Sequence, residues 1–160
     1  MEDNKKEIES IWAAGVPQHI EENDKIKPEE LHIMAINFVM ENCLLKKGFV
    51  IEEGFPRKEF PNIVCKKDDK TYAIIVYPSV YPHFVGLNDE FRLQFMDMCK
   101  KNNAIGLYAS VGYRSIDEER AKAVLVLKGD VFQTLFPGFI VLTDEEKQDM
   151  MVPVEQLFRP

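Results

Sequence analysis

The sequence predicts an α/β fold in which a mixed β-sheet is flanked by helices. Two long segments carry apolar side chains at helical spacing, residues 28–47 and 88–102. Short segments rich in β-branched and aromatic residues lie between and after them, as is typical of strands. The length of 160 residues fits one domain, and no repeat or change of composition divides the chain. We therefore treat residues 1–160 as a single domain.

The predicted helices have recognisable ends. Residues 4–14 predict a short amphipathic helix with its apolar side chains on one side. The clearest helix begins at Pro28, a residue favoured at the first helical position, and ends near residue 47, before Gly48. Its apolar positions cover nearly the full circumference, so we expect it to be buried on most sides. Asn88 is a good N-cap for a further helix that reaches about residue 102.

Three strands are predicted between the two long helices. They span residues 49–55, 60–67 and 71–77. The polar residues Lys67-Asp-Asp-Lys70 between the second and third strands predict a tight hairpin turn. Residues 77–83 are predicted to form a loop, because each of its prolines disfavours helix in the residue before it.

The C-terminal part is predicted to contain four short strands. They are residues 105–113, 123–127, 131–136 and 139–142. The second and third of these look like a hairpin joined by Lys-Gly-Asp. Capping-box patterns that start at Ser115 and Thr143 predict a helical turn to about residue 120 and a terminal helical segment. Gly106 and Gly112 within the first strand indicate close backbone approach or a bulge.

The order of elements from about residue 30 to residue 113 is helix, three strands, helix, strand. This order resembles the common core of the PD-(D/E)xK nuclease superfamily, the restriction-endonuclease-like fold, with residues 114–160 as a C-terminal extension that adds strands. Members of this superfamily often carry Pro-Asp on the second strand and Glu-x-Lys on the third. The Asp and Glu hold a divalent metal, and the Lys orients or activates the attacking water. Here Pro61-Asn62 stands in place of Pro-Asp, and Ile75-Val76-Tyr77 stands in place of Glu-x-Lys.

The predicted hairpin would bring these positions together. If the turn consists of two residues, Asp68 and Asp69, then Asn62 lies directly opposite Ile75 on the neighbouring strand. Tyr77 lies on the same face as Ile75, because side chains alternate along a strand with a period of two. The three positions would therefore converge on one patch, as a metal site requires.

The residue types at this patch argue against nuclease activity. Magnesium prefers anionic oxygen ligands, whereas Asn62 offers a neutral amide, Ile75 offers no ligand and Tyr77 offers no ammonium group. Without a metal, hydrolysis of a phosphodiester loses its main electrophile and its source of hydroxide. We therefore expect no catalytic residue, metal or cofactor at this patch. The alternative is a metal-dependent nuclease with relocated carboxylates. The candidate carboxylates are Glu41, Glu53 and Glu59.

Two further groups of residues are candidates for binding. Small basic clusters could meet phosphates and form a nucleic-acid-binding module without cleavage. They are Lys46-Lys47, Lys66, Lys67 and Lys70, and Lys100-Lys101. Tyr81 and His83 lie in the proline-rich segment near Tyr77 and could form a polar-aromatic pocket. Solvated helix and strand ends explain the lysines more simply, and a loop packed by its own aromatic rings explains Tyr81 and His83. We interpret His32 as a capping or hydrogen-bonded core histidine.

Composition and charge limit the function classes. The formal net charge of −7 disfavours unaided binding to a phosphate backbone. Three distant cysteines without metal-ligand spacing indicate buried, reduced thiols. The sequence has neither a secretory signal pattern nor an apolar run long enough to span a bilayer. We therefore expect a cytoplasmic protein that does not enter the membrane.

These observations lead to one functional hypothesis, a non-enzymatic interaction protein on a scaffold that resembles an inactive nuclease. A protein partner or self-association, such as a homodimer, agrees best with two observations: the motif positions lack metal ligands, and the net charge is negative. The C-terminal part is unusually apolar, which fits either core or a surface for a second subunit, and residues 150–158 are the segment expected to contact a partner.

Overall fold

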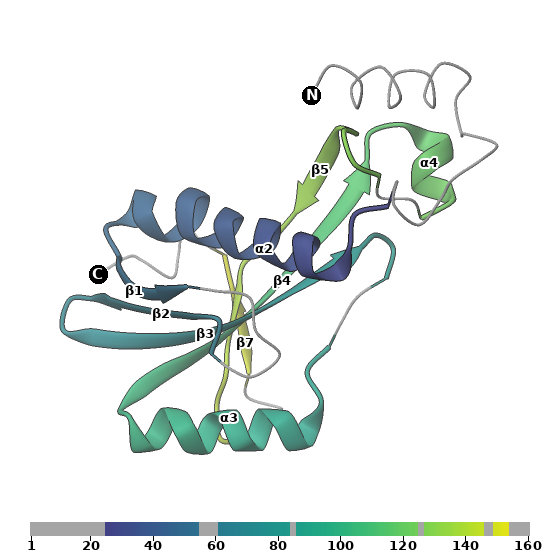
Figure 1. Cartoon of the computed structure of the whole chain (residues 1–160). Coiled ribbons are helices and arrows are strands. Elements are labelled where there is room, and N and C mark those ends of the chain that lie inside the picture. The colour runs from purple at the N-terminus through teal and green to yellow at the C-terminus, as the bar shows by residue number, and fades with distance from the viewer. Residues whose placement is uncertain (1–24, 55–60, 84–85, 125–126, 146–148, 154–160) are drawn as a thin grey trace.

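The computed structural model describes residues 25–54, 61–83, 86–124, 127–145 and 149–153. These residues form one seven-stranded mixed sheet with helices on its two faces, which confirms the predicted α/β class (Figure 1). The helix predicted over residues 4–14 lies outside the described residues, as does Glu59. None of the described helices is long and apolar enough to cross a membrane.

The first long helix follows the predicted bounds but is not regular throughout. α2 (Pro28–Phe38) continues as a π-helical segment, Val39–Leu44, and ends in a 3₁₀ turn, Leu45–Lys47. Gly48 follows with a φ of 86°, a left-handed conformation that glycine adopts without steric cost. The prediction that this helix is buried on most sides is wrong. It packs against one face of the sheet and leaves Leu45 53% exposed.

Three antiparallel strands and a parallel fourth form the centre of the sheet. The elements in chain order are β1 (Val50–Gly54), β2 (Ile63–Lys67), β3 (Lys70–Val80), α3 (Asp89–Lys101) and β4 (Ala104–Ser115). β2 pairs antiparallel with both β1 and β3, and β4 lies parallel to β3. A parallel neighbour needs a crossover connection, which α3 supplies. The order helix, three strands, helix, strand is therefore the one that the sequence predicts.

The turn between β2 and β3 has the predicted register. Asp68 and Asp69 both have positive φ angles, 51° and 63°, as in a two-residue type I′ turn. Lys67 pairs with Lys70 across the hairpin. Aspartate suits this turn because Asp and Asn enter the left-handed region more readily than most other residues with a side chain.

β3 is longer than predicted and runs through Pro78 to Val80, so the loop predicted over residues 77–83 is wrong in its first part. The ladder between β2 and β3 stops at Ile74, and beyond it none of the described strands pairs with this edge of β3. The N–H of Val76 points to this edge. The backbone nitrogen of Pro78 faces the same edge, because Pro78 lies two residues further along the strand. The missing N–H of Pro78 therefore costs the sheet no ladder hydrogen bond.

The C-terminal extension differs most from the prediction. Its elements are α4 (Glu118–Lys122), β5 (Phe132–Leu135), β6 (Phe139–Val141) and β7 (Met150–Val152). β5 and β6 both pair with β4, and β7 pairs with β6. The predicted hairpin between residues 123–127 and 131–136 is wrong, because β4 is long enough to pair with β5 itself. Leu127 instead forms a bridge to Lys25.

Both capping-box predictions also need correction. The carboxylate of Asp117, not Ser115, caps α4 by accepting a hydrogen bond from the Arg120 N–H. The hydroxyl of Ser115 donates to Asp130 and so ties the end of β4 to the following turn. The terminal helical segment predicted from Thr143 is wrong where the structure describes the chain, because residues 150–152 form a strand.

The core occupies both faces of the sheet. α2 packs against Ile74 and Val76, whereas α3 packs against Ile75 on the opposite face, since alternate residues of a strand point to opposite faces. Figure 1 shows the two helices on either side of the strands. A β-carbon at Gly106 would lie 3.1 Å from the ring of Phe95. Glycine there lets α3 approach β4 closely, as the sequence predicts.

Candidate functional site

The hairpin brings the three motif positions together as predicted. Ile63 pairs with Ile74, and the Asn62 N–H donates to the Ile74 carbonyl oxygen at 2.9 Å, so Asn62 lies opposite Ile75. Ile75 and Tyr77 belong to the same apolar cluster on the α3 face of the sheet. The geometry of the patch therefore follows the register of the turn.

Asn62 has a structural task at this patch. It is 2% exposed, and its Oδ1 accepts a hydrogen bond from the Val76 N–H at 2.8 Å. The carbonyl oxygen of Val76 lies 2.7 Å from Nε2 of His32, which must donate because a carbonyl can only accept. The side chains of Asn62 and His32 thus satisfy the N–H and the carbonyl oxygen of Val76, which lies beyond the last residue of β3 that pairs with β2. The interpretation of His32 as a hydrogen-bonded histidine is confirmed.

Ile75 and Tyr77 form part of the packing beneath α3. The side chain of Ile75 is buried with Phe95 and Tyr108. The ring of Tyr77 lies edge-on to the ring of Tyr108, with 5.8 Å between centroids, and 6.4 Å from that of Phe91. Burial raises the pKa of Tyr77, so its phenol stays neutral at physiological pH. Neither side chain provides a charged ligand.

The described residues contain no group of three or more His, Cys, Asp or Glu side chains that could hold a metal ion. Of the carboxylates considered for a relocated site, Glu41 is exposed on the π-helical segment and Glu53 is exposed on β1. The three cysteines are unpaired and buried, as expected. Burial raises the pKa of the Cys65 thiol to about 12, which makes a reactive thiolate unfavourable.

The lysine clusters gather at one end of the sheet. Nζ of Lys67 donates to the carbonyl oxygen of Lys47 at 2.6 Å and lies 5.3 Å from the ring centroid of Phe49. Pairing of Thr71 with Ala104 places the β2–β3 turn beside the end of α3, where Lys100 and Lys101 lie. Figure 1 shows this turn and the end of α3 on the same side of the molecule.

Carboxylates lie among these lysines and offset their charge. Lys66 pairs with Glu52 at 3.1 Å, and Lys100 pairs with Asp144 at 2.6 Å. Asp68 and Asp69 form the turn itself. The end of the sheet is therefore a mixed-charge surface rather than a basic patch.

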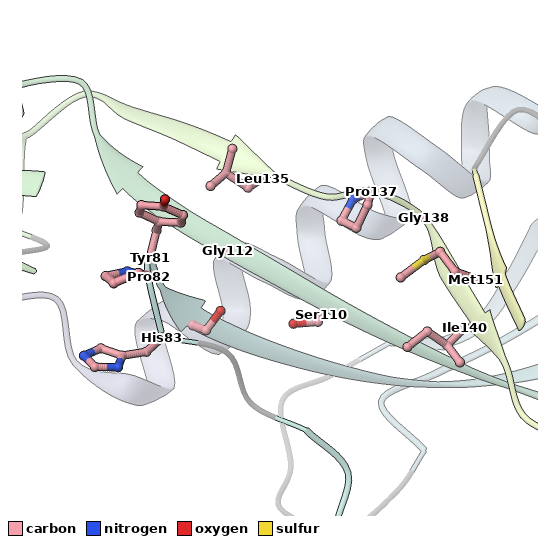
Figure 2. Close-up of a pocket in the computed structure, with 11 residues that line it drawn as sticks. Tyr81, Pro82, His83, Ser110, Gly112, Leu135, Pro137, Gly138, Ile140 and Met151 are labelled. Atoms are coloured by element: carbon pink, nitrogen blue, oxygen red, sulfur yellow. The ribbon is translucent and has the colours of Figure 1, made fainter. Parts of the chain in front are cut away.

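Tyr81 and His83 lie at a different place, a pocket of about 280 Å³ on the α3 face of the sheet. We call it the β3–β4 trough. Ser79 of β3 and Ser110 and Gly112 of β4 line its base, and Figure 2 shows Tyr81 and His83 together at one end. The structure thus places Tyr81 and His83 in one pocket, whereas Tyr77 packs beneath α3.

The trough forms because α3 is shorter than the strands beneath it. α3 has 13 residues and so spans about 20 Å, whereas the 11 residues of β3 span about 36 Å. Phe91, in the first turn of α3, lies over Tyr77, so Ser79 falls beyond the helix. The residues there are small, and the sheet surface is hollow for that reason.

The far wall of the trough comes from the C-terminal extension. Between the two pairings with β4, residues 136–139 lie opposite residues 109–111. The C-terminal segment thus has one residue more than β4 there, so it bulges between β5 and β6. Pro137 and Gly138 at this bulge line the trough, together with Ile140 and Met151 at the end opposite His83 (Figure 2). Two signals in the sequence relate to this pocket: Tyr81 and His83 are candidates for a polar-aromatic pocket, and the position of Gly112 within a strand indicates close approach or a bulge.

Comparison with known proteins identifies the family of the chain. A family model described as Domain of unknown function (DUF8840) matches residues 29–142. This range runs from the second residue of α2 to just past the end of β6 and includes most of the trough. No curated protein matches the chain.

Proposed function

The chain belongs to the family described as Domain of unknown function (DUF8840), and we propose a function for it from its geometry. In this proposal it is a non-enzymatic interaction protein on a scaffold similar to that of the PD-(D/E)xK nucleases. The patch of Asn62, Ile75 and Tyr77 carries this proposal. The hairpin brings the three positions together, yet each side chain serves the fold instead of a metal. The order of elements through β4 supports the likeness of the scaffold. The unpaired buried cysteines support a cytoplasmic location.

The interaction surface in this proposal is the edge of β7. The opposite edge strand, β1, carries Glu52 and Glu53, and charges on an edge oppose the addition of another strand. β7 has no charged residue and pairs only with β6 among the described strands. Met150 and Met151 are 64% and 47% exposed. A second copy of the chain can add its own β7 antiparallel to this edge, which closes a two-fold dimer.

Light scattering over a range of protein concentrations tests this interaction. We expect a homodimer for the wild type and a monomer for Met150→Glu, because a buried unpaired carboxylate would destabilise the interface. Val131→Glu is the matched control, since Val131 is similarly exposed but lies outside β7. A wild type that stays monomeric at every concentration would refute the dimer.

Melting temperatures with and without Mg²⁺ or Mn²⁺ test the absence of a metal site. A metal bound only by the folded state must raise the melting temperature. We expect no change with either ion and no cleavage of plasmid DNA. The alternative, a nuclease with relocated carboxylates, predicts a rise with Mn²⁺ that Glu53→Gln reduces.

A second candidate is a nucleic-acid-binding module without cleavage, which the gathering of lysines at one end of the sheet favours. The interleaved carboxylates and the net charge of −7 argue against it. Fluorescence anisotropy of labelled duplex and single-stranded DNA at low salt decides the question, because phosphate contacts are strongest there. We expect no binding. Binding that is lost at higher salt would favour the nucleic-acid module.

A further inference from the structure

The β3–β4 trough combines a small polar base with apolar walls. Ser79 is 8% exposed, and its hydroxyl makes no hydrogen bond to another side chain within the described part of the protein. Ser110 is engaged by a hydrogen bond with Tyr108. Leu135 and Ile140 supply aliphatic surface on the other side. Pockets that bind small molecules have this character, mostly apolar surface with a few polar groups that fix orientation.

The charge around the trough favours an anion. Among the described residues that line it there is no carboxylate, although the chain as a whole is acidic. His83 lies at one end beside Tyr81 (Figure 2), and the guanidinium carbon of Arg114 lies 5.3 Å from the ring centroid of Tyr81. This end therefore offers an imidazole and a nearby guanidinium, with the Ser79 hydroxyl at the base. The opposite end is lined by the apolar side chains of Ile140 and Met151.

We propose that the β3–β4 trough binds a small amphipathic anion, an apolar ring system that carries one carboxylate or sulfonate group. The ring system lies against Leu135, Ile140 and Met151, and the anionic group accepts hydrogen bonds from Ser79 and His83. The trough does not depend on the nuclease-like scaffold, and Met151 is the residue that it shares with the β7 edge proposed above. A ligand of this class is a small molecule, so the trough adds an activity to the interaction protein proposed above.

Gly112 provides the means to fill the trough without distorting the sheet. A β-carbon at this position would lie 3.5 Å from Cβ of Leu135 and 3.7 Å from Oγ of Ser79, ordinary van der Waals distances. Its backbone does not have a positive φ, so a residue with a side chain is not strained there. Gly112→Val therefore places two methyl groups in the space of the ligand and suits a strand.

Fluorescence titration with two matched dyes tests the proposal. The probes are 8-anilinonaphthalene-1-sulfonate and N-phenyl-1-naphthylamine, which share an apolar ring system but differ in the anionic group. We expect saturable one-site binding of the sulfonate to the wild type and weaker binding of the neutral dye. Gly112→Val should weaken both at least about tenfold, and Ser79→Ala should weaken only the sulfonate, by about tenfold.

Controls separate the trough from general apolar surface. Leu93→Ser removes an exposed leucine on α3, outside the trough, and should leave both affinities unchanged. Gly112→Ala replaces Gly112→Val if the larger side chain lowers the melting temperature, and should still weaken binding. The proposal would be overturned if Gly112→Val left the dye affinities unchanged. It would also be overturned if Leu93→Ser lowered them. Equal affinity for the two dyes would overturn the assignment of an anionic ligand.

Discussion

Removal of the Asn62 side chain tests the structural task assigned to the motif position. In Asn62→Ala, the Val76 N–H loses the acceptor that lies 2.8 Å away, at a site where Asn62 itself is 2% exposed. A buried donor left without a partner costs about 1–3 kcal/mol. For a domain of this length, a loss of about 2 kcal/mol lowers the melting temperature by about 4–8 °C.

The assay is urea unfolding followed by circular dichroism, with Asn102→Ala as the matched control. Asn102 also makes a side-chain hydrogen bond, from Nδ2 to the Met98 carbonyl oxygen, but it is exposed, so its removal should cost less than about 0.5 kcal/mol. If Asn62→Ala unfolds within about 0.5 kcal/mol of the wild type, the hydrogen bond to Val76 is not structural and the reasoning fails.

Asn62→Asp separates structure from metal chemistry at the same position. A carboxylate has nearly the same shape and can still accept the Val76 N–H, but it must be buried as a charge. We expect a loss of stability that Mg²⁺ does not restore, because Ile75 and Tyr77 supply no further ligand. Restoration of the melting temperature by Mg²⁺ would contradict the assignment of this patch as purely structural.

Three further predictions concern the C-terminal extension and the core. Asp149→Asn should cost about 3–5 kcal/mol in urea unfolding because it removes the negative charge that pairs with the buried guanidinium of Arg92. Asp144→Asn, in an exposed pair, should cost less than about 1 kcal/mol. Gly138→Ala should lower the melting temperature sharply, because φ is 148° and a β-carbon would lie 2.3 Å from the Val152 carbonyl oxygen. Burial raises the pKa of the Cys65 thiol from 9.0 to about 12, so the folded state keeps a proton that the unfolded chain releases. The free energy of unfolding, measured in urea at several pH values, should therefore fall between about pH 9 and pH 12, and less steeply in Cys65→Ala.

The central part of the fold could be predicted because its signals are local. Pro28 and Gly48 mark the ends of the first helix, and Asn88 accepts hydrogen bonds from two N–H groups at the start of α3. The Asp68-Asp69 turn fixes the register of the hairpin through backbone angles alone. These features depend on neighbours in the sequence, so they can be predicted without knowledge of the tertiary packing.

The C-terminal extension could not be predicted because tertiary pairing decides it. β5 pairs with β4 rather than with the preceding segment, and nothing within residues 123–136 shows that an unpaired strand edge is available there. The trough depends on the same pairing. Ser79 and Gly112 lie on β3 and β4, Ile140 lies beyond a bulge, and no spacing in the sequence relates them. Only Gly112 and the neighbouring candidates Tyr81 and His83 carried a signal.

The empty motif patch and the trough follow from one geometric cause. Ile75, Tyr77 and Ser79 succeed one another on the α3 face of β3. Where α3 covers this face, at Ile75 and Tyr77, apolar packing fills it and leaves no room for a ligand. Where α3 has ended, at Ser79, the face opens into the trough. The binding proposed for this sheet therefore begins where α3 no longer covers the strands, whatever the chemistry of the motif positions. Asn62→Ala should consequently lower the melting temperature while the affinity for the sulfonate dye, measured well below that temperature, stays unchanged.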